Sequence, residues 1–321
     1  MNHFRTVFKY REPAMFEINH SCTIQLLGSC FAENMVSYFK KDGFDVSANP
    51  FGILYNPISI AKLLKLIVEK RDLDKGSFIT NNNGTGSLLL HSSFAAKDEY
   101  ALQKKFNDMS NIYYEKLTSL ANVHIISIGT SWIYEHIDKK IICGNCHKLP
   151  QSQFRKRLLS INEVSDALNE IATILKQSNT KIIFTVSPVR HLKDGFENNQ
   201  LSKSILHLCM QEVKEKNDNV FYFPAYEIMM DDLRDYRFYE SDLLHPNRLA
   251  ISYLYDFFWQ RYFSETTQQI CEQISKYVLL KNHKLMSKEI DKVADFKQKI
   301  LDEKKRLVQT FPNLEKQLDS L

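Results

Sequence analysis

Four short apolar runs, separated by stretches of helical periodicity, constrain the fold of this chain more than any other feature. Runs that are almost continuously apolar are typical of strands buried on both faces. They lie at Ile24–Leu27, His124–Ile128, Lys181–Val186 and Val220–Phe223. The helical stretches lie at Ile58–Glu69, Ile161–Lys176 and Leu201–Lys216. Strands that alternate with helices predict an α/β fold, a three-layer sandwich with a central parallel sheet and helices on both faces.

Polar residues end three of these strands and predict where a ligand binds. They are Gly28-Ser29-Cys30, Gly129-Thr130-Ser131 and Ser187-Pro188. Ligands of open parallel sheets bind beyond the carboxyl ends of the strands. Ser29 and Cys30 are expected at the start of a helix, where backbone N–H groups and the helix dipole favour a thiolate or an oxyanion. A buried and unreactive cysteine fits the same layout.

A second motif lies near the end of the predicted sandwich, at Tyr239-Glu240-Ser241-Asp242-Leu243-Leu244-His245-Pro246-Asn247. Asp242 and His245 are three positions apart in one loop, so both side chains can reach the same site. The carboxylate would hold the imidazole tautomer while the other ring nitrogen accepts a proton from a nucleophile. A helix-capping Asp beside an exposed His is the alternative interpretation.

Together, the two motifs resemble the GDSL or SGNH hydrolase superfamily, in which the nucleophile follows the first strand and Asp-x-x-His precedes the last helix. The closer resemblance is to the GSCFA family, whose name is spelled out by Gly28-Ser29-Cys30-Phe31-Ala32. Other stretches similar to that family are Phe4-Arg5-Thr6, Asn49–Pro57, Gly129-Thr130-Ser131-Trp132, Asn145-Cys146-His147-Lys148, Thr185–His191 and Arg234–Tyr239. The resemblance covers residues 4–260 and implies an SGNH-hydrolase-like, flavodoxin-like sandwich.

The resemblance implies catalytic roles for four residues. His245 matches the superfamily base and Asp242 its partner. The superfamily reads Gly-Asp-Ser where this chain reads Gly28-Ser29-Cys30, so Cys30 falls on the nucleophile position. A shift of one residue would make Ser29 the nucleophile instead. We prefer Cys30, because the register keeps Gly28 fixed and a thiol is intrinsically more nucleophilic than a hydroxyl.

The resemblance also implies an oxyanion hole, built from the nucleophile N–H, a Gly after the second strand and an Asn after the third. Gly52 is the expected second donor. Ser131 occupies the position of the Asn, and Asn145 could supply the amide that Ser131 lacks. Arg190 and His191 follow a strand-like run and could bind an anionic substrate group or the acyl donor, although a solvated loop charge is the alternative.

Cys143-Gly144-Asn145-Cys146-His147 matches the Cys-x-x-Cys-His pattern of haem attachment. Haem attachment normally goes with export, and the charged N-terminal stretch lacks the apolar run of a secretory signal. A zinc site would need a second clear Cys/His pair. We therefore expect neither a metal nor a cofactor, and we expect reduced thiols and a cytoplasmic location. A redox-active pair of thiols at Cys143 and Cys146 remains the alternative.

Composition argues against two classes of partner. The 42 basic residues are interleaved with 38 acidic ones, a net charge of +4 that is too balanced to indicate nucleic acid. A run of about 18 apolar residues, as a membrane span requires, is absent from the sequence. The expected partner is a small-molecule or carbohydrate ester substrate.

The composition shifts after about residue 263 to Lys, Glu, Asp, Gln and Leu. Met286, Val293, Ile300 and Leu307 recur at every seventh position. We predict a GSCFA/SGNH-hydrolase-like domain over residues 1–263 and a C-terminal helical arm over residues 264–321. The arm is expected as a long helix that packs on the domain, on a partner or on a second copy of the chain.

These expectations converge on acyl-ester chemistry. His245 would deprotonate Cys30, and Cys30 would attack the acyl carbonyl to form a covalent acyl-enzyme. Discharge to water would make the protein an esterase, and discharge to a glycan hydroxyl would make it an O-acyltransferase. The alternative from another class is a non-catalytic scaffold that binds a glycan in the same pocket.

Overall fold

The central sheet contains five parallel strands in the order β10-β9-β5-β1-β2. We use a computed structural model of the chain and describe residues 6–10, 14–81, 84–118, 122–176, 180–283 and 290–321 of it. The strands are β1 (Thr23–Gly28), β2 (Asp45–Ala48), β5 (Asn122–Ile128), β9 (Lys181–Val186) and β10 (Val220–Tyr222). The four predicted strands are all present. The additional strand, β2, is a polar segment at the edge of the sheet.

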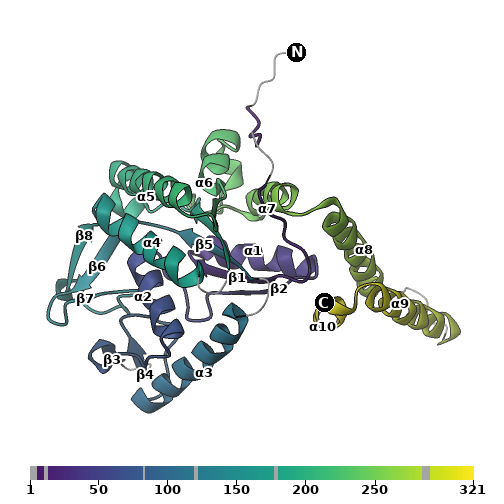
Figure 1. Cartoon of the computed structure of the whole chain (residues 1–321), viewed down its shortest axis with the longest axis horizontal. Helices are drawn as coiled ribbons and strands as arrows, with labels where there is room; N and C mark the ends of the chain where they lie inside the picture. The colour runs from purple at the N-terminus through teal and green to yellow at the C-terminus, as the bar shows by residue number, and fades with distance from the viewer. Residues whose placement is uncertain (1–5, 11–13, 82–83, 119–121, 177–179, 284–289) are drawn as a thin grey trace.

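Helices cover both faces of this sheet (Figure 1). They are α1 (Cys30–Lys41), α2 (Pro57–Val68), α3 (Glu99–Leu117), α4 (Ile161–Lys176), α5 (Phe196–Lys216), α6 (Ala225–Glu227) and α7 (Arg248–Tyr262). Alternate residues of a strand point to opposite faces. Accordingly, Leu27 packs in the core beneath α2–α5, whereas Leu26 packs in the core beneath α1 and α7. The predicted three-layer α/β sandwich is confirmed.

Gly28 allows the turn after β1 to approach β5 closely. Its φ is +115°, and a Cβ at this position would lie 2.0 Å from the carbonyl oxygen of Ser127. The Gly28 N–H donates to Oδ1 of Asn49 at 2.9 Å, and the Ser29 N–H donates to the Ser127 carbonyl at 2.8 Å. These contacts fix Ser29 as the residue that precedes the first turn of α1.

Two small antiparallel sheets are added to the sandwich. One contains β7 (Ile141–Ile142), β6 (Trp132–His136) and β8 (Phe154–Leu158) in that order, and the other pairs β3 (Phe78–Asn81) with β4 (Gly84–Ser87). The β6–β8 sheet is an insertion between β5 and α4. Its two ends are tied together, because the Leu159 N–H donates to the Ser131 carbonyl at 2.9 Å.

The C-terminal arm consists of α8 (Glu265–Asn282), α9 (Ile290–Thr310) and α10 (Glu315–Ser320), and it extends away from the sandwich (Figure 1). It has its own small core of Ile274, Tyr277, Leu307, Leu314 and Leu318. The arm is therefore helical as predicted, but it is not one long helix, because α8 ends at Asn282 and packs against α9. Met286 lies outside the described residues.

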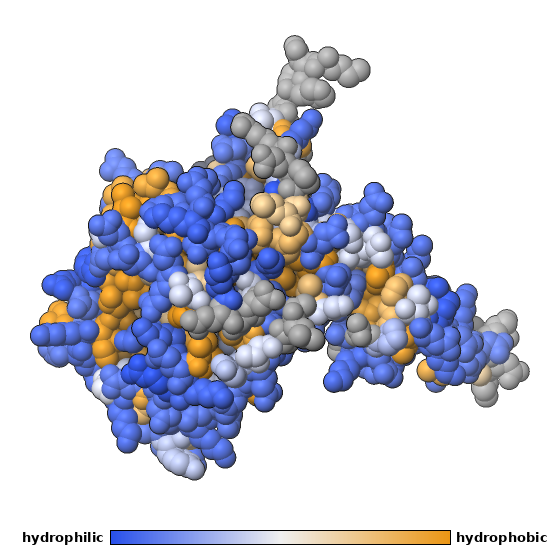
Figure 2. Space-filling model, viewed as in Figure 1, coloured by the Kyte–Doolittle hydropathy of each residue, from blue (hydrophilic) through white to orange (hydrophobic). Residues whose placement is uncertain are grey.

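Short 3-10 and π turns connect the larger elements. They are Lys75–Ser77, Gln151–Gln153, Leu192–Asp194, Ile228–Asp232, Tyr236–Phe238 and Pro312–Leu314. Among the described helices, none combines the length and the apolar character that crossing a bilayer requires. Polar residues cover most of the face shown in Figure 2.

Candidate functional site

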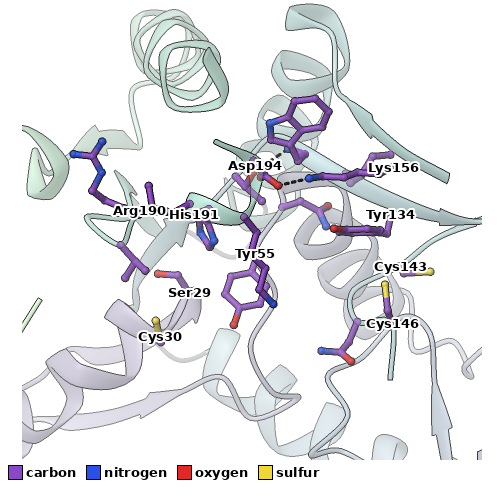
Figure 3. Close-up of a pocket in the computed structure, with 18 of the residues that line it drawn as sticks. Ser29, Cys30, Tyr55, Tyr134, Cys143, Cys146, Lys156, Arg190, His191 and Asp194 are labelled. Atoms are coloured by element: carbon purple, nitrogen blue, oxygen red, sulfur yellow. Dashed lines mark hydrogen bonds and ion pairs between the residues drawn. The ribbon is translucent and has the colours of Figure 1, made fainter. Parts of the chain in front are cut away.

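A cavity of about 400 Å³ is lined by the segments that follow β1, β5 and β9. Ser29 and Cys30 enter it after β1, Thr130 after β5, and the segment 189–194 after β9. His245 reaches the same cavity from the loop before α7. Figure 3 shows the side chains that converge there. The cavity thus lies where a parallel sheet is expected to bind its ligand.

Ser29 and Cys30 differ in how accessible they are. Ser29 is 1% exposed, and its hydroxyl shares a hydrogen bond of 2.8 Å with the buried hydroxyl of Ser127. Cys30 is half-buried and begins α1. Burial raises the pKa of the Cys30 thiol, and the Glu33 charge adds to the rise. Backbone N–H groups of α1 and the charge of Lys203 lower the Cys30 pKa and so act in the opposite direction.

Asp242 and His245 form a hydrogen-bonded pair. Nδ1 of His245 lies 2.6 Å from Oδ2 of Asp242. The other carboxylate oxygen accepts the backbone N–H groups of Leu244 at 2.9 Å and His245 at 3.0 Å. These backbone bonds, followed by the bond to the ring, lower the pKa of Asp242 to about 2. The carboxylate therefore stays charged and holds the proton of His245 on Nδ1, which leaves Nε2 as the acceptor.

Cys30 and His245 are 215 positions apart in the sequence, yet both line the same cavity. No hydrogen bond joins the Cys30 sulfur to the His245 ring among the described residues. Catalytic hydrogen bonds are often long or poorly aligned before substrate binds. The placement brings a thiol, an imidazole and a carboxylate to one site.

Gly52 and Ser131 do not reach this cavity. The Gly52 N–H donates to the Asn49 carbonyl at 2.7 Å within its own turn, so it is not available as an oxyanion donor. Ser131 is fully buried, and its hydroxyl donates toward Ser202 of α5. Neither residue can fill the oxyanion role that the resemblance implied.

Two asparagines offer amide donors in their place. Asn145 lines the cavity, and its side-chain oxygen accepts the His147 N–H at 2.7 Å. Asn56 also lines the cavity, and its side-chain oxygen accepts the Ser59 N–H at 2.9 Å to cap α2. Both bonds use the oxygen and leave the amide N–H groups as donors. Asn56 was not expected from the sequence, although it lies in the Asn49–Pro57 stretch that resembles the family.

Arg190 and His191 both line the cavity, as their position after β9 predicted. Burial is the main cause that lowers the pKa of His191 to about 4, with a further contribution from the charge of Lys203. His191 is therefore neutral at pH 7. Its Nε2 is buried without a hydrogen-bond partner and lies against Gly129 and the ring of Tyr55.

Lys203 is a functional candidate that the sequence analysis missed. It is fully buried on α5, and its Nζ donates to the carbonyls of Gly129 at 2.8 Å and Ser187 at 2.7 Å. These carbonyls follow β5 and β9, so the amine joins the two strand ends beneath the cavity. Burial lowers the pKa of Lys203 to about 7. The sequence signal that could have predicted its burial is the position of this lysine on the apolar side of α5, between Ser202 and Leu206.

The β6–β8 sheet forms the wall opposite Cys30. Lys156 of β8 makes an ion pair with Asp194, which follows β9, and its Nζ lies 5.0 Å from the centre of the Trp132 ring. Figure 3 shows this pair at the edge of the cavity. The contact ties the inserted sheet to the segment that carries Arg190 and His191.

Cys143 and Cys146 line the same wall, and both are free thiols. Burial raises the pKa of Cys146 to about 11, and burial together with its neighbour raises that of Cys143 to about 12. Neither thiol is activated as a redox dithiol requires. Within the described ranges, no group of three or more His, Cys, Asp or Glu residues could hold a metal ion.

Comparison with known proteins identifies the family. No curated protein matches the chain. Among solved structures, the Clostridium thermocellum family 3 carbohydrate esterase aligns over 79% of this chain and 98% of its own, with 11% identity and a TM-score of 0.31. The model of the GSCFA family matches residues 23–258, which include all the cavity residues described above. The chain therefore belongs to the GSCFA family.

Proposed function

We propose that this protein is an SGNH-type acyl-ester hydrolase that works through a thioester on Cys30. The observation that carries the proposal is the hydrogen-bonded pair of Asp242 and His245 in one cavity with a half-exposed thiol at a helix N-terminus. A nucleophile, a base and a residue that orients the base are the parts that covalent acyl transfer needs. The ester would belong to a small or carbohydrate-linked substrate.

The reaction begins with transfer of the Cys30 thiol proton to Nε2 of His245. Because burial raises the pKa of Cys30, the thiol depends on this base at neutral pH. The thiolate sulfur attacks the acyl carbon and forms a C–S bond. As the tetrahedral intermediate collapses, the C–O bond to the leaving group breaks and His245 returns its proton to the departing alkoxide.

The second half releases the acyl group. His245 takes a proton from water, and the resulting hydroxide attacks the thioester. As the C–S bond breaks, His245 returns the proton to the departing sulfur, which gives a carboxylic acid and the free thiol. A sugar hydroxyl in place of water would give an O-acyltransferase. In both half-reactions, the oxyanion is expected to face the backbone N–H of Cys30 and the amides of Asn56 and Asn145.

Cys30 is favoured over Ser29 as the nucleophile on two grounds. The Ser29 hydroxyl is nearly inaccessible and bonded to Ser127, whereas the sulfur of Cys30 is half-buried at the cavity. A thiol is also the stronger nucleophile at comparable protonation.

The test compares hydrolysis of 4-nitrophenyl acetate by the wild type and by Cys30→Ala, Ser29→Ala and His245→Ala. We expect the Cys30 and His245 variants to lose at least about a hundredfold in rate. Ser29→Ala is expected to keep most of the activity, and mass spectrometry should show an acetyl group on Cys30 during turnover.

Cys146→Ser is the matched control, because it changes another half-buried thiol of the same cavity. It should hydrolyse the ester at the wild-type rate. Equal rates for the wild type and all three site variants, each with an unchanged melting temperature, would exclude the proposed mechanism.

A further inference from the structure

A second cavity, of about 550 Å³, adjoins the proposed ester site. Arg190 and Leu192 line both cavities and form the boundary between them. The second cavity lies between the segment after β9 and the segments 229–236 and 239–243 that lead to His245. A substrate whose ester bond lies in the first cavity can therefore extend past Arg190 into the second.

Arg190 is a cation without a counter-ion at this boundary. Among the described residues, no carboxylate lies within ion-pair distance of it. Nη1 faces the sulfur of Met230 at 3.6 Å, the guanidinium carbon lies 5.8 Å from the centre of the Phe196 ring, and Nε is buried without a partner. A guanidinium is always charged and carries five N–H donors, so Arg190 has charge and donors to offer to a ligand.

The carboxylates that line the two cavities, and the one that holds His245, are already paired. Asp194 pairs with Lys156, and Asp242 pairs with His245. At the far side of the second cavity, Asp235 faces Arg237 at 3.5 Å. The free positive charge of Arg190 therefore favours an anion, and a carboxylate or phosphate matches the planar fork of donors.

Three aromatic side chains line the second cavity, together with leucine and methionine side chains and the Arg234-Asp235 segment. Phe196 is 67% exposed and Tyr236 is 73% exposed, although both line a cavity wall. The rings of Tyr236 and Tyr239 lie 6.2 Å apart. Exposed ring faces beside hydroxyl groups suit a sugar ring, which has an apolar C–H face and polar edges.

We propose that the second cavity binds an anionic sugar unit of the ester substrate, with Arg190 on its carboxylate or phosphate and the rings of Phe196 and Tyr236 against its C–H face. The proposal rests on the proposed function, because that function places the ester bond in the first cavity. The backbone N–H of Arg190 donates to the Leu244 carbonyl at 3.3 Å, so the anion site and the loop that carries His245 are in direct contact.

The test is calorimetric titration of the full chain with glucuronate, glucose 6-phosphate and neutral methyl glucoside. At least one anionic sugar should bind about tenfold or more tightly than methyl glucoside, and the tighter of the two identifies the anion. Arg190→Gln should abolish this preference, and Arg190→Lys should restore part of it. Binding of the anion should also weaken as salt is added.

Matched controls separate a local effect from a general change of charge or surface. Arg71→Gln removes the same charge from an exposed arginine that lines neither cavity and should bind like the wild type. Tyr236→Ala should weaken binding of all three sugars, whereas Tyr100→Ala, which removes a 79% exposed tyrosine on α3, should not. The proposal would be overturned if the wild type bound neutral and anionic sugars equally well. It would also be overturned if Arg190→Gln kept the wild-type preference for the anionic sugar.

The binding assay tests the sugar site separately from the catalytic mechanism. Cys30→Ala should keep the affinity and the anion preference of the wild type. If the wild type hydrolyses no ester but still shows a preference that depends on Arg190, the anionic-sugar site stands and the hydrolase proposal falls. If hydrolysis depends on Cys30 but no sugar binds at millimolar concentration, the sugar site falls alone.

Discussion

Replacement of Lys203 with Met removes the buried amine beneath the candidate nucleophile and tests whether that amine titrates as the structure indicates. Met preserves the length of the side chain and has no titratable group. Lys203 has an ordinary pKa near 10.5 in an unfolded chain, and burial lowers it to about 7 in the fold. Between these values the unfolded chain binds more protons than the folded protein. The wild type should therefore gain stability as pH rises through this window, and the variant should lack that gain.

The magnitude follows from the size of the pKa change. One pKa unit corresponds to about 1.36 kcal/mol. Integrated from pH 7 to pH 9.5, the proton-binding difference gives the wild type about 3 kcal/mol of additional unfolding free energy relative to Lys203→Met. A neutral amine keeps two N–H donors, so the bonds to Gly129 and Ser187 persist after deprotonation.

Urea unfolding followed by tryptophan fluorescence measures this difference at several pH values. Both proteins carry Cys30→Ala in this comparison, because the charge of Lys203 lowers the pKa of Cys30. The other buried thiols and the tyrosines also titrate above pH 8, but they are common to both proteins and cancel when one free energy of unfolding is subtracted from the other. A difference that stays constant to within about 1 kcal/mol from pH 7 to pH 9.5 would refute the reasoning. It would mean that the folded protein does not lower the pKa of Lys203.

Three further substitutions have outcomes that the structure specifies. Asp242→Asn should leave the melting temperature unchanged but lower ester hydrolysis about 10²–10⁴-fold, because its amide would donate to Nδ1 of His245 and move the ring proton to Nε2. Phe258→Ala should lower the free energy of unfolding by about 3–5 kcal/mol in urea, because this fully buried ring packs against several others. Gly28→Ala should cost about 3 kcal/mol or more in the same assay, because its Cβ would meet the carbonyl oxygen of Ser127 at 2.0 Å.

Each of these outcomes has a contrary result. Tyr100→Ala, on an exposed position of α3, should change stability by less than about 0.5 kcal/mol. If Phe258→Ala or Gly28→Ala costs no more than this control, the packing described at those positions is incorrect. Full activity of Asp242→Asn would show that the tautomer of His245 does not limit the reaction.

The sandwich could be predicted because its central strands are buried on both faces. Such strands leave a nearly continuous apolar run, as in Lys181–Val186 and His124–Ile128. The β6–β8 sheet left no such signal, because only some of its residues are buried. In β8, Phe154 is buried but Arg155 and Lys156 are exposed.

The residues proposed as nucleophile and base could be singled out from the sequence because each lies in a short motif at a strand or helix boundary. The hydrogen-bond donors of the expected oxyanion hole could not be predicted, since a position after a strand does not fix where a side chain points. Ser131 follows β5 as expected, yet its hydroxyl turns into the protein toward Ser202. Lys203 was missed for a related reason, because a helical lysine is normally exposed. Its acceptors, at Gly129 and Ser187, come together only in the folded sheet.

The tie between Leu159 and Ser131 has a consequence for how substrate preference can diverge among relatives of this protein. The chain leaves the sandwich at Ser131 and returns to it at Leu159, and these two residues are in contact. The β6–β8 segment between them can therefore change in length or sequence without separating β5 from α4. Such a change would reshape one wall of the cavity while Cys30, His245 and their supporting strands keep their places. We therefore expect differences in ligand preference between relatives to follow sequence changes in the β6–β8 segment more than changes in the central sheet.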